Sequence, residues 1–460
     1  MNMKRSGKIT LIVIGSILGA TILTIAGVYT YLKLYDAPTQ VDKIENDTGL
    51  VKAHNRGLYD KDGNRLKLKG VNAGNVLLQE GWMSPFANEP IKNEDGTYKK
   101  DNDNNLQYNE YAQETFLNDL KSNPNLKDKE EELKEYYYKS FFSENDFKII
   151  KEELGLNTIR LPFYWRNILN DDFSRKEESV AFSYLDWFLT NCKNNELYCV
   201  LDLHGVPGSQ NAFEHSGYLV EEPGFWDNEE YINTAIDIWD YISNYYTNKK
   251  SDLGKYIATY DVLNEPDDKK NNSKSDRCIK FYDRIYKTIR ANNDNHVITF
   301  EGIWTFAKLP NPNDYKWENV MYSYHFYNWK HDIISTEVFK LYEMIYNIGR
   351  DYNVPTFVGE FTGFDDMEAW KDTIIHWYDD YEYNWTIWSY KTTVTGWWTS
   401  SWGVYTNTMN LDTSKEETKV LVKTCSEEEF RKACDDCKTS NCKTGTLYNF
   451  LKEYKETNNK

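Results

Sequence analysis

Two glutamates at the ends of different hydrophobic runs are the residues of this sequence best suited to acid–base chemistry. Glu265 follows Leu263-Asn264, and Glu360 follows a run that begins at Pro355. Hydrolysis of a glycosidic bond needs two carboxyl groups in different protonation states. One must donate a proton to the leaving oxygen, so its surroundings must raise its pKa, and the other must be ionised to attack or stabilise the anomeric carbon. The two glutamates predict this chemistry if the fold brings them together.

Polar and aromatic side chains at the ends of other runs could complete such a site. Arg160 and Tyr327 could hydrogen-bond the ionised carboxyl group and hold its pKa down. Asn264 could bind a sugar hydroxyl, and Trp388 suits the apolar face of a pyranose ring. Each residue alone is more often structural, since a glutamate before proline usually lies on the surface and a buried histidine usually belongs to the core. The candidate binding residues are Arg160, His204, Asn264, His325, Tyr327 and Trp388.

Eight short runs rich in β-branched and aromatic residues must position these side chains. They cover residues 66–73, 157–163, 198–204, 258–264, 296–301, 320–327, 355–361 and 385–390. Segments with helical periodicity separate most of them, at 144–154, 180–194, 228–246, 274–292, 336–352 and 366–381. Strands that alternate with helices in this way predict an α/β fold, a (β/α)8 TIM barrel, in which catalytic groups come from the carboxyl ends of the strands.

Two segments are too long for ordinary barrel connections. They are residues 76–142 and 391–446, and because each follows a strand, we expect both to lie over the catalytic face. Residues 57–69 carry Asp-Gly-Asn between two strand-like pieces, which predicts a hairpin that could plug the barrel floor. The predicted organisation is a tail and membrane segment at 1–33, a polar tether at 34–55 and a catalytic domain at 56–460.

The N-terminus has the pattern of an uncleaved signal anchor. Lys4, Arg5 and Lys8 precede 24 uncharged residues, from Ile9 to Leu32. This stretch is long enough to cross a bilayer as one transmembrane helix, and the positive charges before it predict a cytoplasmic tail with the remaining chain on the extracellular side. Secretion after signal cleavage is the alternative. Gly15 and Gly19 have a spacing that could pair two such helices in a weak homodimer.

The composition bears on the partners of the chain. A net charge of −18 argues against nucleic acid, because phosphate binding needs basic patches. The charge fits a neutral polymer, and with 15 Trp and 36 Tyr some exposed rings are available to stack on sugars.

Four of the seven cysteines lie close together near the C-terminus: Cys425, Cys434, Cys437 and Cys442. On the outer side of a membrane, this spacing predicts a loop held by disulfides, with a zinc knuckle as the alternative. Cys192 and Cys199 could pair across a helix-to-strand turn or remain two buried thiols.

Taken in order, the candidate residues resemble the pattern of glycoside hydrolase family 5. The matching residues are Arg160, His204, Asn264-Glu265-Pro266, His325-x-Tyr327, Glu360 and Trp388, within about residues 57–405. The resemblance implies a retaining double-displacement mechanism with Glu265 as acid/base and Glu360 as nucleophile. It also implies that His325 and Tyr327 lie near the nucleophile and that Trp388 stacks beneath the −1 sugar. It implies no metal or other cofactor, and no strand end carries the His-x-His typical of metal-dependent barrel hydrolases.

Two further passages look like the exo-β-1,3-glucanase branch of that family. They are Gly70-Val71-Asn72-Ala73-Gly74-Asn75, which leads to Trp82, and residues 204–211, which are followed by His215-Ser216-Gly217. The branch implies a glucan 1,3-β-glucosidase acting on β-linked glucan or glucoside. Ala73, Asn75 and the stretch 388–391 depart from its pattern. Endo-β-1,4-glucanase, β-mannanase and glycolipid glucosidase therefore stay open, as does a glucan-binding pseudoenzyme.

Overall fold

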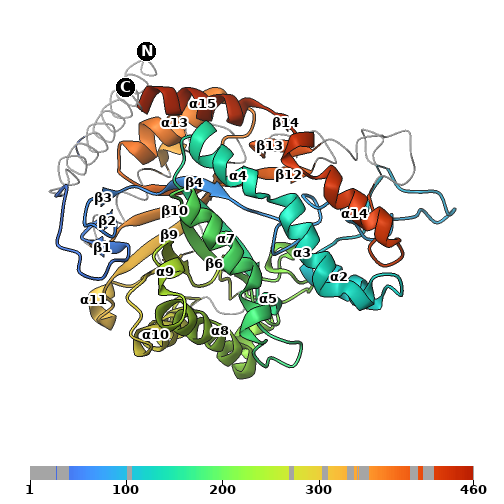
Figure 1. Ribbon diagram of the computed structural model, residues 1–460, viewed down its shortest axis with the longest axis horizontal. Helices are drawn as coiled ribbons and strands as arrows, with labels where there is room; N and C mark the ends of the chain where they lie inside the picture. The colour runs from blue at the N-terminus through green and yellow to red at the C-terminus, as the bar shows by residue number, and fades with distance from the viewer. Residues whose placement is uncertain are drawn as a thin grey trace, which may run out of the picture.

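The computed structural model describes residues 27, 41–100, 106–268, 274–302, 309–328, 336–338, 340, 352–393, 402–407 and 419–458. Eight strands close into a barrel in the order β10-β11-β4-β5-β6-β7-β8-β9, and every neighbouring pair is parallel (Figure 1). These strands are β4 (Lys69–Asn72), β5 (Thr158–Tyr164), β6 (Tyr198–Gly205), β7 (Ile257–Asp261), β8 (Val297–Glu301), β9 (Val320–Tyr327), β10 (Thr356–Thr362) and β11 (Asn384–Ile387). The predicted (β/α)8 barrel is confirmed.

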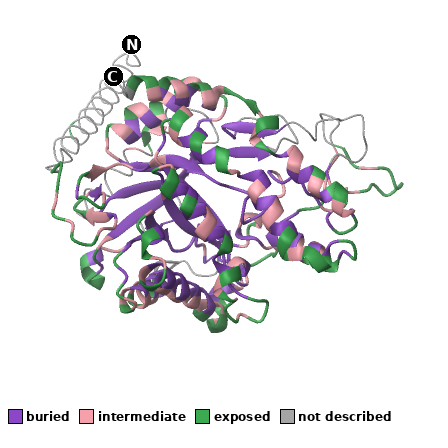
Figure 2. Ribbon diagram, in the orientation of Figure 1, coloured by how far each residue is buried: buried purple, intermediate pink, exposed green. Residues whose placement is uncertain are grey.

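Helices pack around the outside of the barrel and bury one face each. In α8 (Glu229–Asn248) the buried residues Ala235, Ile238, Trp239 and Ile242 recur at helical spacing, and the indole of Trp239 donates to the backbone oxygen of Val262 over 2.9 Å. Figure 2 shows the resulting contrast between buried strands and helices with exposed outer faces. The longer outer elements are α4 (Glu144–Lys148), the π-helical η2 (Ile149–Glu153), α7 (Ser183–Asn194), α10 (Lys274–Ala291), α13 (Met367–Thr373), the π-helical η6 (Ile374–Asp379) and α15 (Thr446–Asn458). Short helices complete the connections: α5 (Trp165–Ile168), α6 (Glu178–Ala181), η3 (Glu214–Ser216), η4 (Phe225–Asp227), α9 (Ser251–Gly254) and α11 (Pro312–Tyr315).

A small antiparallel sheet covers the end of the barrel where the strands begin. It consists of β1 (Lys52–His54), β2 (Gly57–Tyr59) and β3 (Arg65–Leu66), with the predicted hairpin between β2 and β3. Leu58 of this sheet packs in one buried cluster with Val200, Val297 and Phe357, which lie near the amino ends of their strands. The floor is therefore closed, and the opposite end carries the site.

The two long segments contain helices that pack against each other. The first holds α2 (Gln113–Ser122), η1 (Lys127–Lys129) and α3 (Glu130–Phe141), and the second holds α14 (Glu427–Asp436). Phe86 stacks on Phe430 with ring centroids 4.9 Å apart, and Phe116 stacks on the same two rings. In Figure 1, α2, α3 and α14 lie together on the right, away from the β1–β3 sheet on the left. A second small sheet consists of β12 (Lys391–Thr393), β13 (Tyr405–Asn407) and β14 (Lys443–Thr444) and joins the beginning of the second segment to its end.

The cysteine-rich stretch differs from the prediction of a disulfide-held loop. All seven cysteines are free thiols, so that prediction is wrong. The stretch folds instead as α14, because Ser426 and Glu429 form a capping box that satisfies the amides of its first turn. Cys434 and Cys437 are fully buried there and act as core residues. Cys192 and Cys199 are also two buried thiols.

The predicted transmembrane segment lies outside the described residues, apart from Gly27, and so does its Gly15–Gly19 pair. Among the helices of the described chain, no helix has both the length and the apolar character needed to cross a membrane. Most of the helix predicted at 336–352 also lies outside the described residues.

Candidate active site

A cavity of about 250 Å³ opens at the carboxyl ends of the barrel strands, and both glutamates line it. His204, Tyr327 and Trp388 line it too, as the sequence predicts. Arg160, Asn264 and His325 are buried next to these residues. Arg160 contacts Glu360 and Asn264, and His325 contacts Glu265. All eight sequence-predicted residues are therefore brought together.

Glu360, on β10, is held as an anion. Arg160 Nη1 donates to its Oε1 over 2.8 Å, and the hydroxyl of Tyr327 donates to its Oε2 over 2.6 Å. Burial raises the pKa of Glu360, but the charges of His325 and Arg160 outweigh it and hold the pKa below the usual value. An ionised carboxylate of this kind can attack an electrophilic carbon.

The guanidinium of Arg160 is fixed on every side, so its contact with Glu360 is rigid. Its Nε donates to Asp261 over 2.9 Å, and its Nη2 lies 3.1 Å from Asp202. Nη1 and Nη2 also donate to the side-chain oxygens of Asn72 and Asn264, over 3.0 and 2.9 Å. Burial lowers the pKa of Arg160, but the surrounding carboxylates raise it overall, so the side chain stays charged. Asp202 and Asp261 thus orient the arginine that contacts Glu360.

Glu265 follows β7 in a left-handed backbone conformation, with φ of 42°. Its amide donates to Oε2 of Glu301 over 2.8 Å, which fixes this turn. His325 Nδ1 lies 2.8 Å from one carboxyl oxygen of Glu265, and His215 Nε2 lies 2.8 Å from the other.

The protonation of Glu265 differs from the sequence-based expectation for a proton donor. Burial raises its pKa, but the charge and hydrogen bond of His215 and those of His325 hold the pKa well below its ordinary value. The sequence predicts a raised pKa, and that prediction is wrong for the free site because it did not include two imidazoles on one carboxyl group. Glu265 is therefore the ionised partner of two imidazoles, His215 and His325, whose pKa values the nearby carboxylates raise.

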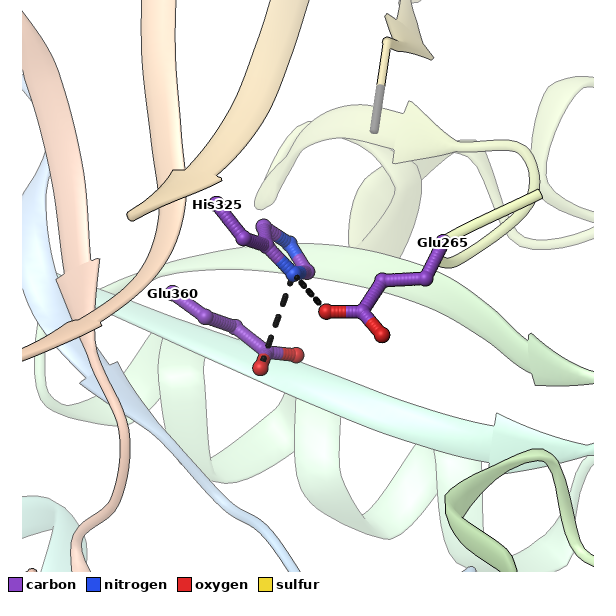
Figure 3. A group of neighbouring side chains, drawn as sticks. All are labelled: Glu265, His325 and Glu360. Carbon is purple, nitrogen blue, oxygen red and sulfur yellow. Dashed lines mark hydrogen bonds and ion pairs between the residues drawn. The ribbon is translucent and has the colours of Figure 1, made fainter. Parts of the chain in front are cut away.

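Figure 3 shows how Glu265, His325 and Glu360 point toward one another, with His325 between the two carboxyl groups. One atom from each residue lies within 4.8 Å of the other two, so the two glutamates have oxygens within that distance. Such a trio could in principle ligate a metal ion. Here, however, charged protein groups already neutralise both carboxylates, Arg160 on Glu360 and His215 on Glu265. The donor set therefore fits a pair of working carboxyl groups better than a metal site.

The remaining predicted residues surround the place where a sugar ring would lie. Trp388 stacks on the ring of His204, with centroids 5.6 Å apart and planes at 15°. Burial lowers the pKa of His204 to about 3, so that ring is neutral. Within the described chain, Nδ2 of Asn264 is buried without a hydrogen-bond partner, so it remains available to a hydroxyl group.

Several residues of the site are missed by the sequence reasoning. Glu80, Trp82 and Trp402 line the cavity from the two long segments, and Glu301 and His215 both contact Glu265. Glu301 ends the fifth predicted strand, so its position alone could have identified it. His215 lies in the passage that resembles the exo-β-1,3-glucanase branch, but its partner Glu265 is 50 residues further along the sequence. Glu80 and Trp402 carry no local signal, since long connections position both.

Comparisons with known proteins agree with this geometry. A family model described as cellulase, glycosyl hydrolase family 5, matches residues 108–393, more than half of the chain. A β-xylosidase of Phanerodontia chrysosporium is 29% identical over 280 residues, which are 60% of this chain and 52% of that protein. A glucan 1,3-β-glucosidase of Candida oleophila is 30% identical over 256 residues, or 55% and 54% of the two chains. The chain spans about half the length of these curated relatives.

Solved structures show the same fold. A rutinosidase from Aspergillus niger aligns with a TM-score of 0.52 at 16% identity, over 73% of this chain and 95% of that one. The fold, the cluster around the two glutamates and the family model all agree with the residue pattern. The chain belongs to glycoside hydrolase family 5.

Proposed function

We propose that this protein is a retaining β-glycoside hydrolase that cleaves β-linked glucan, of the glucan 1,3-β-glucosidase type. The observation that carries the proposal is the pair Glu265 and Glu360, which face each other at one cavity with oxygens within 4.8 Å. Retaining enzymes keep their carboxyl groups close, at about 5 to 5.5 Å, whereas inverting enzymes separate them by about 6.5 to 9.5 Å to admit a water molecule. The short separation supports retention.

In the proposed mechanism, Glu360 attacks the anomeric carbon while Glu265 donates a proton to the departing oxygen. Arg160 and Tyr327 orient the nucleophile and keep it ionised. A water molecule deprotonated by Glu265 then releases the sugar from Glu360. Asn264 would bind a hydroxyl of the same sugar, and Trp388 would support its apolar face.

Residues of the two long segments favour attack at the end of a glucan chain. Glu80 and Trp82 come from the first segment, Trp402 comes from the second, and all three line the cavity. The rings of Trp82 and Trp402 lie 5.3 Å apart and so join the two segments at the cavity. A cavity walled in this way accepts the terminal sugar rather than the middle of a polymer. The relative from Candida oleophila, named a glucan 1,3-β-glucosidase, supports the β-1,3 linkage.

A hydrolysis screen tests the proposal. The purified protein is incubated with laminarin, barley glucan, cellulose and mannan, and the products are followed from the first minutes. We expect laminarin to be preferred and glucose to be the only early product. A ladder of mixed oligomers from the outset would contradict exo action, and hydrolysis of none of the polymers would favour the glucan-binding pseudoenzyme. Preference for cellulose or mannan would favour the endo-β-1,4-glucanase or β-mannanase alternatives, and a glucosylceramide added to the screen tests the glycolipid one.

The same proposal includes a membrane location. The 24 uncharged residues 9–32, preceded by Lys4, Arg5 and Lys8, support a single-pass signal anchor with the catalytic domain, residues 56–460, on the extracellular side. Gly15 and Gly19 could pair two copies weakly. Membrane fractions washed with alkaline carbonate should retain the protein, and protease added to intact cells should remove the domain. Release into the medium would favour signal cleavage instead.

A further inference from the structure

We propose that His215 is a positioning residue that holds the proton used by Glu265, so that the acid/base of this site is a histidine–glutamate pair. The inference rests on the proposed function and deepens it. It concerns where the proton resides before the sugar bond is cleaved and which group sets the alkaline limit of the reaction.

The geometry joins His215 directly to the acid/base. Its Nε2 lies 2.8 Å from Oε2 of Glu265, the oxygen that His325 leaves free. The amide nitrogen of Asn211 lies 3.1 Å from the same Nε2 and donates to the backbone oxygen of Glu265, also over 3.1 Å. The ring of Phe213 stacks on His215 with centroids 5.3 Å apart. The carboxyl group of Glu265 and the ring of Phe213 therefore hold the imidazole, and the side-chain amide of Asn211 anchors the backbone of Glu265 beside it.

His215 differs from His325, the other imidazole on Glu265. His325 is fully buried, and its Nδ1 lies between Glu265, Glu301 and Glu360, at 2.8, 3.6 and 3.6 Å. The side chain of His215 is 23% exposed and lines the cavity, so it can exchange protons with water. His215 is thus the imidazole that can reload Glu265 between turnovers.

The titratable groups that face His215 come from four parts of the chain. Glu265 follows β7, Glu80 lies in the first long segment, and Glu214 precedes His215 in η3. His204, whose ring is neutral, lies near the end of β6 with its ring centroid 6.3 Å from that of His215. Burial lowers the pKa of His215, but the three carboxyl groups, Glu265 foremost, raise it to about 10. Glu80 contributes less at neutral pH, because burial raises its own pKa to about 8.

The proton balance of the pair is simple. In the free site one proton is on Nε2 of His215 and Glu265 is ionised. As the glycosidic bond lengthens, Glu265 passes a proton to the departing oxygen and takes the proton of His215, which becomes neutral. In the second step, Glu265 removes a proton from the attacking water and returns it to His215, so the pair regains its starting state.

The alkaline limb of the pH profile of kcat/KM tests whether His215 holds the proton that Glu265 donates. The pair is active while it holds its proton, and activity is lost as the pH rises through the pKa of the pair. In His215→Asn, Glu265 keeps only His325 beside it, so the transferable proton must be held by Glu265 itself. An ordinary glutamate loses its proton about two pH units below an ordinary histidine. We expect the alkaline limb of kcat/KM on laminarin to move at least one pH unit lower, and the same shift in His215→Gln. With a dinitrophenyl glucoside, whose leaving group needs no proton, this alkaline limb should be absent from the wild type and the variants alike.

A matched control and a second readout separate the possible failures. His376→Asn, on the exposed face of η6, should leave the profile unchanged. NMR titration of the seven histidines should give His215 a pKa well above 6.5 in the wild type and a value at least one unit lower in Glu265→Gln. An unmoved alkaline limb in folded His215→Asn and His215→Gln, or a His215 pKa that does not respond to Glu265→Gln, would overturn the inference. Inactivity of the wild type on every glucan would instead contradict the proposed function, whatever the titration gives.

Discussion

At the scale of single residues, the site depends on which groups donate to each carboxyl oxygen. One oxygen of Glu360 accepts a hydrogen bond from a guanidinium and the other accepts one from a phenol. Each oxygen of Glu265 instead contacts an imidazole. The two side chains are the same, and their sequence positions alone do not show how their protonation differs. Their different neighbours, contributed by other strands and loops, allow one to remain an anion and the other to exchange a proton.

Tyr327→Phe removes the hydroxyl that donates to Glu360, the proposed nucleophile, and keeps the aromatic ring. Glu360 must be ionised to attack, so activity is lost as the pH falls through its pKa, which is held low in the folded protein. A hydrogen bond to a charged group contributes about 1.5 to 3 kcal/mol, so its loss should raise the pKa of Glu360 and move the acid limb of kcat/KM about one to two pH units higher. A pH profile measures this shift. An acid limb that stays in place would show that the phenol does not stabilise the anion.

Glu265→Ala should affect substrates according to their leaving groups. A glucan needs its departing oxygen protonated, so kcat/KM on laminarin should fall by about 10²- to 10⁴-fold. A dinitrophenyl glucoside needs no proton in the first step and should be cleaved at close to the wild-type rate until the glycosyl-enzyme accumulates. Steady-state and burst kinetics on both substrates measure the difference. An equal loss on both would contradict the acid/base role.

At the scale of the elements, close packing between neighbouring strands aims the side chains. Gly359 on β10 lies beside His325 on β9, and a Cβ at Gly359 would lie 2.8 Å from Nε2 of that ring. The absence of a side chain at Gly359 thus leaves room for the imidazole that contacts Glu265. The sequence predicts both strands but not this contact, because the register between β9 and β10 follows only from the closed barrel.

Gly359→Ala should therefore displace His325 and impair catalysis more than folding. Small displacements of a catalytic group can cost about 10²-fold in rate, and we expect a loss of that order in kcat with a modest fall in Tm. Gly445→Ala is the matched control, since a Cβ there has no neighbour within 4 Å. Kinetics and thermal melts of both variants decide the point. Equal behaviour of the two variants would show that the ring tolerates the contact.

Local patterns predicted most of the secondary structure and failed where distant parts of the chain meet. All eight predicted strands exist, but the last ends at Ile387 rather than Tyr390. Beyond it, the amide of Ser389 donates to Trp402 and that of Tyr390 donates to Asn72, so the chain leaves the barrel wall. The cysteine spacing predicted a disulfide loop, whereas the capping-box residues Ser426 and Glu429 indicate the start of the helix α14 that the structure shows.

At the scale of the whole molecule, two long segments far apart in the sequence meet over the open end of the barrel. Phe86 of the first and Phe430 of the second stack within one buried cluster, and Asn123 donates to the backbone oxygens of Val422 and Cys425 over 2.7 and 2.8 Å. The length of the segments predicted that they would cover the catalytic face. Their mutual packing, which brings Glu80 and Trp402 to the cavity, could not be read from either segment alone.

Phe430→Ala tests how strongly this contact supports the fold. The side chain is fully buried between aromatic rings, so its removal should lower the free energy of unfolding by about 3 to 5 kcal/mol. Because Glu80 and Trp82 belong to the segment that Phe430 supports, KM on laminarin should rise more than kcat falls. Val180→Ala, at an exposed position on α6, is the control. Denaturant unfolding measures the energy, and a loss under 1 kcal/mol would show that the segments are held elsewhere.

The central claim is that Glu360 attacks the sugar while Glu265 moves the proton. A 2-deoxy-2-fluoroglucoside with a good leaving group should inactivate the enzyme and trap the sugar on the nucleophile, and peptide mass spectrometry then locates it. We predict one fluoroglucosyl group per protein, on the peptide that contains Glu360, and none in Glu360→Gln. A sugar attached to another residue, or products released with inverted anomeric configuration and no trapped intermediate, would contradict the account.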